Sequence, residues 1–265
     1  MITVNKMVWL ALSMAMGFFT FMFMNAKQRN VIYHDMKLGV GNKASKQLTV
    51  FFISDIHRRK IDGKLLAKIC EGREIDVVII GGDLAERGVP LARITQNIRH
   101  LSTLGPLFFV WGNNDREVGE AAIREILGRY GGKVLDNETV SIPGHSDWGL
   151  CGTDDPSSRN VNIDSALHNI DQYKEVIVVT HTPSLFRKVE QMCLPRLMLA
   201  GHTHGGQIRL GKWGLQEKGA FRLDQGRAKL VSNGYGTSTV PLRLGAAPEC
   251  HVITIHYEES VLKEL

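Results

Sequence analysis

The sequence predicts one α/β domain behind a single N-terminal membrane-spanning helix. Three observations support this fold class: a 20-residue uncharged apolar segment at residues 7–26, short apolar runs that alternate with helix-like stretches over residues 48–257, and an ordinary globular composition, with 43% apolar and 22% charged residues among 265. This composition excludes a disordered chain, a collagen and a polytopic membrane protein. The four cysteines form no C-x-x-C pair, which argues against a zinc ribbon or a disulfide scaffold.

The apolar segment at residues 7–26 is long enough to span a bilayer. A helix of this length measures about 30 Å, the thickness of the hydrocarbon core. A buried core helix would show a polar face, but only three of the 20 residues are polar. A cleaved signal peptide, the remaining alternative, has a shorter apolar region and a small-residue cleavage site that Met24-Asn25-Ala26 fits poorly. We therefore expect residues 1–29 to be a retained, single-pass anchor in the cell membrane.

Positive charge is concentrated just after this segment. Residues 1–47 hold six basic residues and one acidic residue, whereas the remaining 218 residues hold 26 of each sign. Lys27, Arg29 and Lys37 follow the segment and only Lys6 precedes it, so we expect the domain on the cytoplasmic side. Residues 30–47 are expected to form a basic juxtamembrane arm, either attracted to anionic headgroups of the lipid bilayer or simply solvated. Because the body is neutral, no nucleic-acid-binding groove is expected.

The body, residues 48–265, alternates strands and helices. The pattern predicts strands at residues 48–54, 77–80 and 107–111, with helices at 63–73, 90–102 and 118–130. Further strands are expected at 134–142, 149–152, 176–180, 197–200, 207–210, 229–232 and 251–257, with a short helix at 162–169. The continuous apolar runs indicate strands that are buried on both faces. The alternating pattern of the last strand suggests a half-exposed edge.

Residues that can bind a metal follow five of these strands, at the ends where open α/β sheets collect ligands. Taken singly, the Asp and Asn motifs are more often turns or helix caps, and His181 could be an ordinary buried histidine, whereas the H-x-H of residues 202–204 is moderately suggestive of a metal site. Five such strand ends in order are much harder to explain by structure alone. The candidate metal ligands are Asp55, His57, Asp83, Asn113, His181, His202 and His204.

Seven donors are enough for two metal ions. One shared carboxylate gives eight bonds and leaves positions for water and substrate, and Asp83, on a tight glycine turn, is suited to the shared position. Imidazole and oxygen donors without cysteine suit Mn, Fe, Zn or Co better than Ca or Mg, and we favour Mn. The predicted cofactors are therefore two divalent metal ions. Such a pair is typical of phosphoester hydrolysis, because it clamps the attacking and leaving oxygens.

The blocks D-x-H, G-D, G-N-x-D, a strand-end His and G-H-x-H, in this order, resemble the calcineurin-like metallophosphoesterase family over roughly residues 48–257. The runs GHTHGGQIRL and VSNGYGTSTVPLRLGAAPE resemble its membrane-associated bacterial branch. The resemblance implies a four-layer α/β/β/α sandwich of two mixed sheets. It also implies one metal held by Asp55, His57, Asp83 and His204, and another held by Asp83, Asn113, His181 and His202.

One position departs from the pattern of the family. Asn114 stands where the family usually has a histidine that contacts the phosphate and can protonate the leaving group. An amide can donate a hydrogen bond but cannot pass a proton, so poor leaving groups should react slowly. Asn114 and Asp83 are the predicted catalytic residues. His145 could supply the missing acid, although an exposed loop histidine is the simpler interpretation. Residues 58–60, Arg-Arg-Lys, could hold a phosphate or form an ordinary solvated turn.

The sequence thus predicts a membrane-anchored dimetal phosphohydrolase that cleaves a phosphodiester or pyrophosphate by attack of a metal-bridging hydroxide. The anchor would hold the cleft near the bilayer, which makes a lipid-linked phosphoester plausible, with nucleotide or cell-wall phosphodiesters as alternatives. The alternative function is a membrane-tethered, non-catalytic binding or scaffold module that retains the fold. Asn114 favours this alternative, and the presence of all seven donors argues against it. A protein phosphatase is disfavoured because the short body leaves little room for a peptide groove.

Overall fold

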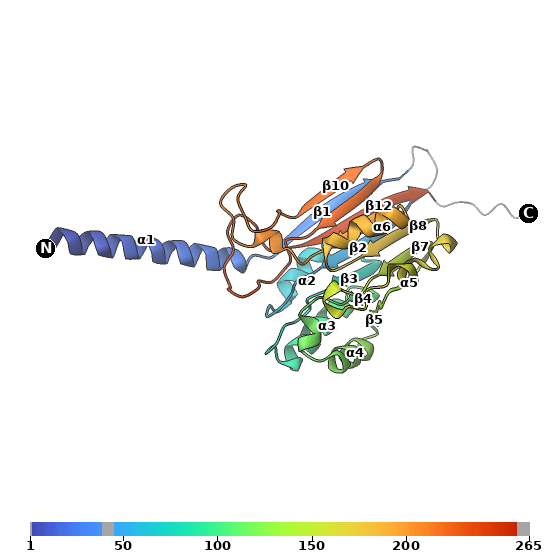
Figure 1. The fold of residues 1–265 in the computed structure, drawn as a ribbon, viewed down its shortest axis with the longest axis horizontal. Coiled ribbons are helices and arrows are strands. Elements are labelled where there is room, and N and C mark those ends of the chain that lie inside the picture. Colours follow the sequence, from blue (N-terminus) through green and yellow to red (C-terminus); the bar gives the residue numbers. More distant parts are fainter. Residues whose placement is uncertain (1, 39–44, 259–265) are drawn as a thin grey trace, which may run out of the picture.

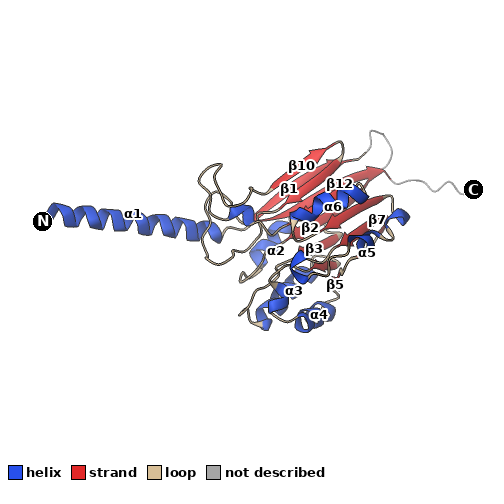
Figure 2. Cartoon of the chain, viewed as in Figure 1, coloured by secondary structure: helices blue, strands red, loops and turns tan. Residues whose placement is uncertain are grey.

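The computed structural model describes residues 2–38 and 45–258. In these residues one long N-terminal helix, α1 (Ile2–Ala26), precedes a body of two six-stranded sheets with helices on their outer faces (Figures 1 and 2). This is the four-layer arrangement that the sequence resemblance implies. Both sheets are mixed, because each combines parallel with antiparallel pairs.

The first sheet has the strand order β1-β12-β2-β3-β4-β5. From β2 to β5 the strands are parallel, because helices return the chain between them. The strands are β1 (Asn30–Lys37), β2 (Ser45–Ile53), β3 (Val77–Gly81), β4 (Leu107–Val110), β5 (Lys133–Val134) and β12 (Glu249–Glu258). The helices on its outer face are α2 (Gly63–Ile69), α3 (Leu91–Ser102) and α4 (Glu120–Arg129).

The second sheet has the strand order β10-β11-β9-β8-β7-β6. Its central strands, β7, β8, β9 and β11, are parallel, and hairpins add β6 and β10 at the two edges. The strands are β6 (Glu138–Ile142), β7 (His145–Gly152), β8 (Glu175–Val179), β9 (Leu197–Ala200), β10 (Ala220–Asp224) and β11 (Arg227–Val231). Its outer face is covered by α5 (Ile163–Leu167) and α6 (Phe186–Met192).

Three apolar layers hold the sandwich together. In β2, Phe51 and Ile53 pack against the helices of the first sheet, whereas Val50 and Phe52 face the second sheet. A third layer lies between the second sheet and its helices. Because the central strands are covered on both faces, their sequences are continuously apolar, which is why the runs at 48–54, 77–80 and 107–111 predicted strands.

Helix α1 projects away from the body (Figure 1). Its residues 4–26 are long and apolar enough to cross a membrane. Among these residues only Met22 and Ala26 have buried side chains, so most of the apolar surface meets no other part of the described chain. A helix that is apolar all round is typical of a membrane span.

Residues 30–37 belong to the body, in contrast to the expected juxtamembrane arm at 30–47. β1 pairs with β12 along its whole length, and β2 begins at Ser45, so the expected boundary at residue 48 falls inside a strand. Met36 is buried, but Ile32, Tyr33, Asp35 and Lys37 are exposed, as is common at a sheet edge. The segment contains Val31, Ile32, Tyr33 and Met36, but these do not alternate regularly with polar residues and basic residues lie around them, which explains why it resembled a linker. Lys43 of the expected arm lies outside the described residues.

Three strand predictions are corrected by the structure. β12 lies inside the first sheet and not at its edge, because β1 covers it. The single strand expected at 134–142 is two short strands, and the chain passes from one sheet to the other between them. Residues 207–210 form no regular strand, only isolated bridges. The alternating Ile208 and Leu210, which suggested that strand, are 39% and 70% exposed.

Candidate metal centre

The seven candidate ligands meet at one end of the sandwich, between the two sheets. Asp55 and His57 follow β2, Asp83 follows β3, Asn113 follows β4, His181 follows β8, and His202 and His204 follow β9. Backbone groups help to join the sheets here: the backbone N–H of His202 donates to the Asp55 carboxylate at 3.1 Å, and Nδ1 of His181 lies 2.8 Å from the carbonyl oxygen of Gly81.

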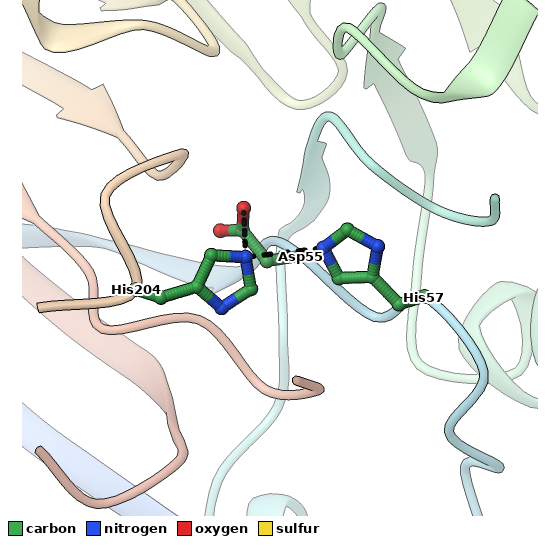
Figure 3. Close-up of side chains that lie close together, drawn as sticks. All are labelled: Asp55, His57 and His204. Atoms are coloured by element: carbon green, nitrogen blue, oxygen red, sulfur yellow. Dashed lines mark hydrogen bonds and ion pairs between the residues drawn. The ribbon is translucent and has the colours of Figure 1, made fainter. Parts of the chain in front are cut away.

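Asp55, His57 and His204 form the first half of the centre. Nε2 of His57 lies 3.1 Å from Nε2 of His204, which lies 3.4 Å from Oδ1 of Asp55. Figure 3 shows both imidazole rings and the carboxylate turned toward one another. All three side chains are buried, and one donor atom from each lies within 4.8 Å of the others. This spacing is compatible with shared coordination of one cation.

Asn113, His181 and His202 form the second half. Oδ1 of Asn113 lies 3.2 Å from Nε2 of His181 and 2.9 Å from Nδ1 of His202, and the two histidine nitrogens are 3.3 Å apart. His181 is buried, whereas His202 is exposed. This half of the centre is therefore open to solvent and to a substrate.

Asp83 lies between the two halves. Its Oδ2 is 3.6 Å from Nε2 of His57 and 3.5 Å from Nε2 of His181. Asn114 orients this carboxylate, since its backbone N–H donates to Oδ1 at 2.8 Å and its side-chain amide donates to Oδ2 at 2.7 Å. The carboxylate thus contacts histidines of both halves, and Asn114 is in direct contact with it.

The electrostatics of the centre favour added positive charge. Burial alone would lower the pKa of His181, but the carboxylates of Asp83 and Asp55 outweigh burial and raise the pKa to about 10. Burial, together with Asp83, raises the pKa of Asp115 to about 7. The shift at His181 reflects the negative potential of these carboxylates, whereas the shift at Asp115 is due first to burial and then to Asp83. The buried imidazoles and carboxylates therefore fit a pair of divalent cations in chemistry as well as in position.

Contacts behind the histidines fix the orientation of their rings. Nδ1 of His181 can only donate to the Gly81 carbonyl, which leaves its Nε2 free to bind a cation. Nδ1 of His57 lies 2.9 Å from Oε2 of Glu86, close in distance but poorly aligned for a regular hydrogen bond. Sequence reasoning missed Glu86, because a glutamate three residues after Asp83 belongs to no motif that was recognised.

Asp115 ties the turn after β3 to the turn after β4. Its buried carboxylate accepts hydrogen bonds from the backbone N–H groups of Gly112 and Asp83, each at 2.8 Å, and of Ala85 at 3.1 Å. Gly112 is needed at this contact, because a Cβ there would lie 2.2 Å from the backbone nitrogen and Oδ1 of Asp83. Asp115, the fourth residue of the G-N-N-D motif, therefore has a structural role: it holds the turn after β4 against the turn after β3.

Five of the seven donors have a left-handed backbone. The φ angles are 54° at Asp55, 50° at His57, 51° at Asp83, 70° at His202 and 49° at His204. Such residues cost on the order of 1–3 kcal/mol each and persist only where the surrounding structure holds them, which is most common at functional sites. The sequence patterns indicated which residues converge, but not this strain.

Arg243 supports the centre from behind His204 and was also missed. Its buried guanidinium donates to the carbonyl oxygens of Gly236 at 2.6 Å, Asn233 at 2.7 Å and Ala246 at 3.0 Å. Its Nη2 lies 3.2 Å from Nδ1 of His204. Burial lowers the pKa of Arg243 to about 10. The side chain therefore joins the loop after β11 to the turn that carries His204.

The structure gives no role in the centre to His145 or to Arg58 and Arg59, which the sequence suggested as a possible acid and possible phosphate ligands. His145 begins β7, about 23 Å along the strand from Gly152 at its other end, and its Nδ1 lies 2.8 Å from the Tyr257 hydroxyl. It is therefore not placed to protonate a leaving group. Arg58 pairs with Glu86, and Arg59 stacks on the Tyr235 ring at 3.8 Å. These contacts are structural.

A recess of about 370 Å³ opens beside the turn that carries His202 and His204. Thr203 of this turn is part of its wall. The other lining residues include Phe186, Lys218, Arg222 and Lys229. Lys229 is paired with Glu190 at 2.5 Å, so Lys218 and Arg222 are the remaining basic groups of the recess, and Glu217 also lies in its wall.

Comparisons with known proteins agree with this geometry. Residues 48–206 match the model of the calcineurin-like phosphoesterase family. The chain is 43% identical over 237 residues to YpbG of Bacillus subtilis, covering 88% of this chain and 90% of YpbG. It is 29% identical over 179 residues to the phosphodiesterase YaeI of Escherichia coli, covering 61% and 62% of the two chains.

A solved structure extends the comparison at the level of the fold. A 5'-nucleotidase precursor from Thermus thermophilus superposes with a TM-score of 0.50 at 12% identity. The match covers 80% of this chain and 55% of that one, so a large part of the nucleotidase has no counterpart here. At this identity the likeness concerns the fold alone.

Proposed function

Because the chain belongs to the calcineurin-like phosphoesterase family, we propose that it is a membrane-anchored hydrolase that cleaves a phosphodiester or a pyrophosphate. Metal-dependent phosphoester hydrolysis follows from membership of the family, together with candidate ligands that are brought together between the sheets. The observation that carries the proposal is the position of Asp83, whose carboxylate contacts histidines of both halves of the centre.

The two halves would each hold one divalent cation, with Mn²⁺ favoured. Asp55, His57 and His204 would bind the first, Asn113, His181 and His202 the second, and Asp83 both. Cations bound there would lower the pKa of a water molecule and neutralise charge on the attacking and leaving oxygens. The protein itself keeps the rings and carboxylates oriented through Glu86, Asp115 and Arg243.

Asn114 sets the preference for leaving groups. One hydrogen of its side-chain amide is donated to Asp83, and the other is available for a phosphate oxygen. An amide cannot deliver a proton, so we expect efficient cleavage only where the leaving group is acidic, as in a pyrophosphate or an aryl ester. In the recess beside the turn that carries His202 and His204, Lys218 and Arg222 would hold an anionic group of the substrate.

The membrane part of the proposal rests on α1. Its exposed apolar surface supports a single span, and the basic residues Lys27, Arg29 and Lys37 on the body side support a cytoplasmic domain. A lipid-linked phosphoester would then be the natural substrate class, because the centre is held near the bilayer. A reporter enzyme fused after residue 29 tests the orientation: alkaline phosphatase should be inactive there and β-galactosidase active, and the reverse would place the body outside.

The catalytic proposal is tested with the purified full-length protein and bis(p-nitrophenyl) phosphate. We expect hydrolysis with added Mn²⁺ and its loss with EDTA. Asp83→Asn should reduce the rate by more than about 100-fold, since even groups that only support metal ligands typically contribute 10–100-fold. Asp164→Asn, at an exposed position on α5, is the matched control and should keep the rate. Equal rates of the two variants would refute the role of Asp83.

The alternative function, a tethered module without turnover, makes the opposite prediction. It would bind Mn²⁺ but release no product from any ester in this assay. The buried, oriented donors and the network behind them support turnover, because a scaffold gains nothing from five strained ligand positions.

A further inference from the structure

The loops that follow the centre carry exposed apolar side chains beside the body end of α1. Leu210, Trp213 and Leu215 are 70%, 72% and 92% exposed, and Val240 is 40% exposed. They lie on two segments, residues 207–216 and 238–244, which we call the rim. In Figure 1 the loops in the orange and brown part of the colour range surround the point where α1 meets the body.

Hydrogen bonds join the two segments of the rim into one connected surface. The backbone N–H of Arg209 donates to the carbonyl oxygen of Leu244 at 2.8 Å, and the Gln207 amide donates to the carbonyl oxygens of Ser238 and Val240 at 2.9 Å each. The buried guanidinium of Arg209 closes the first segment by donating to the carbonyl oxygens of Gly205 at 3.1 Å and Lys212 at 2.9 Å. These hydrogen bonds fix the backbone of both segments, and the apolar side chains of the rim remain exposed on it.

The contacts of α1 place the rim at the level of the membrane surface. The backbone N–H of Arg243 donates to the carbonyl oxygen of Met22 at 3.1 Å, and Met22 is only 4% exposed. Met22 lies four residues before Ala26, the last apolar residue of the span, or about 6 Å along the helix axis. The body thus overlaps the last turn of the apolar span, which places it at the boundary between the acyl chains and the headgroups.

The composition of the rim matches that location. Neither segment contains an acidic residue, and the first combines a tryptophan with a lysine, Lys212, directly before it. Exposed tryptophan with leucine and lysine is typical of surfaces at the boundary between headgroups and acyl chains. A protein partner could bind the same apolar residues, but α1, as a membrane span, places this side of the body next to a bilayer.

We propose that the rim inserts into the bilayer interface and holds the metal centre against the membrane surface. The rim is built directly on the His204 turn, so docking it fixes where the centre opens relative to the lipid. A substrate with its phosphate at the headgroup level would then reach the centre without leaving the bilayer. The inference rests on the proposed membrane anchoring by α1, and its test separates the two.

Tryptophan fluorescence tests both steps in the full-length protein, reconstituted in vesicles of phosphatidylethanolamine and phosphatidylglycerol with or without brominated acyl chains. Trp9 reports α1 and Trp213 reports the rim, and both are exposed enough for replacement by phenylalanine. Trp111 and Trp148 are fully buried and provide the same background in every variant. In Trp9→Phe the brominated lipid should quench Trp213, and in Trp213→Phe it should quench Trp9.

The double variant Trp9→Phe/Trp213→Phe should lose this quenching. If Trp9 is quenched and Trp213 is not, and aqueous iodide quenches Trp213 instead, the rim stays in water and the inference is overturned while the anchor stands. If neither residue is quenched by brominated lipid, the anchor itself fails, and the rim proposal fails with it.

Discussion

Asp83 and Asn114 act as a unit at the residue scale. Asn114 donates two hydrogen bonds to the Asp83 carboxylate, one from its backbone N–H and one from its side-chain amide. These bonds fix the position of the two residues relative to each other. The strained backbone at Asp83 is held by Asp115, which accepts its N–H. The chemistry of the centre therefore depends on short contacts between neighbouring turns, and single substitutions can separate catalysis from folding.

Asn114→His should restore proton donation to the leaving group. An imidazole with a pKa near neutrality can act as a general acid, which typically contributes 10²–10⁴-fold. We expect the ratio of the rate on an alkyl phosphodiester to the rate on bis(p-nitrophenyl) phosphate to rise by at least about 10-fold. The ratio corrects for any loss of the amide contact with Asp83. An unchanged ratio would mean that another group already protonates leaving groups.

Glu86→Gln should weaken metal binding without unfolding the body. The contact with His57, together with Arg58, holds the pKa of Glu86 below its ordinary value, so the residue is a carboxylate that faces the ring. Losing such a partner typically costs 10–100-fold in metal affinity. The measurement is the Mn²⁺ concentration at half-maximal activity. Glu117→Gln, at an exposed pair with Arg87, is the control, and an equal effect of both variants would remove this role from Glu86.

At the scale of elements, the junction of β1 with β12 contains a buried histidine. Nδ1 of His251 lies 3.1 Å from Nε2 of His34 on β1, and its Nε2 lies 3.0 Å from Oγ of Ser232 and 3.6 Å from Oε1 of Glu249. Burial, with a smaller effect of His34, lowers the pKa of His251 to about 3. The folded protein therefore keeps this ring neutral where the unfolded chain would protonate it.

This junction should lose stability in acid. Between pH 6.5, the ordinary pKa, and pH 3 the unfolded state binds the extra proton, so the free energy of unfolding falls by up to about 1.4 kcal/mol per pH unit as the pH drops below 6.5. That corresponds to roughly 3–6 °C in Tm per unit. His251→Gln should melt with a smaller pH slope over this range. Identical slopes would show that His251 does not titrate on unfolding.

The candidate ligands could be predicted from the sequence because each lies shortly after a buried strand. Residues in such positions are brought together at one end of the sheets. The central strands were predictable from their continuous apolar runs, and the helices from stretches in which apolar and polar residues fall on different faces. β1 was not predicted, because its apolar residues show no regular alternation and two of them, Ile32 and Tyr33, are exposed at the edge of the sheet. Glu86 and Arg243 were not, because their roles depend on contacts with residues far away in the chain.

At the scale of the whole molecule, the centre spans the seam between the sheets. Asp55, His57, Asp83 and Asn113 come from the first sheet, whereas His181, His202 and His204 come from the second. Without cations this end of the seam brings buried carboxylates together, with a potential that raises the pKa of His181. Bound cations would neutralise that charge and link the two layers.

Metal removal should therefore destabilise the whole body and not only stop turnover. A ligand at 100 times its Kd stabilises the folded state by about 2.7 kcal/mol. For a body of this size that is roughly 5–10 °C in Tm. Melting the full-length protein in detergent with Mn²⁺ or with EDTA measures the difference. Asp83→Asn, which lacks the shared carboxylate, should show a much smaller difference, and Ca²⁺ should replace Mn²⁺ poorly because it prefers oxygen donors. Equal melting with Mn²⁺ and with EDTA would mean that no cation joins the two sheets.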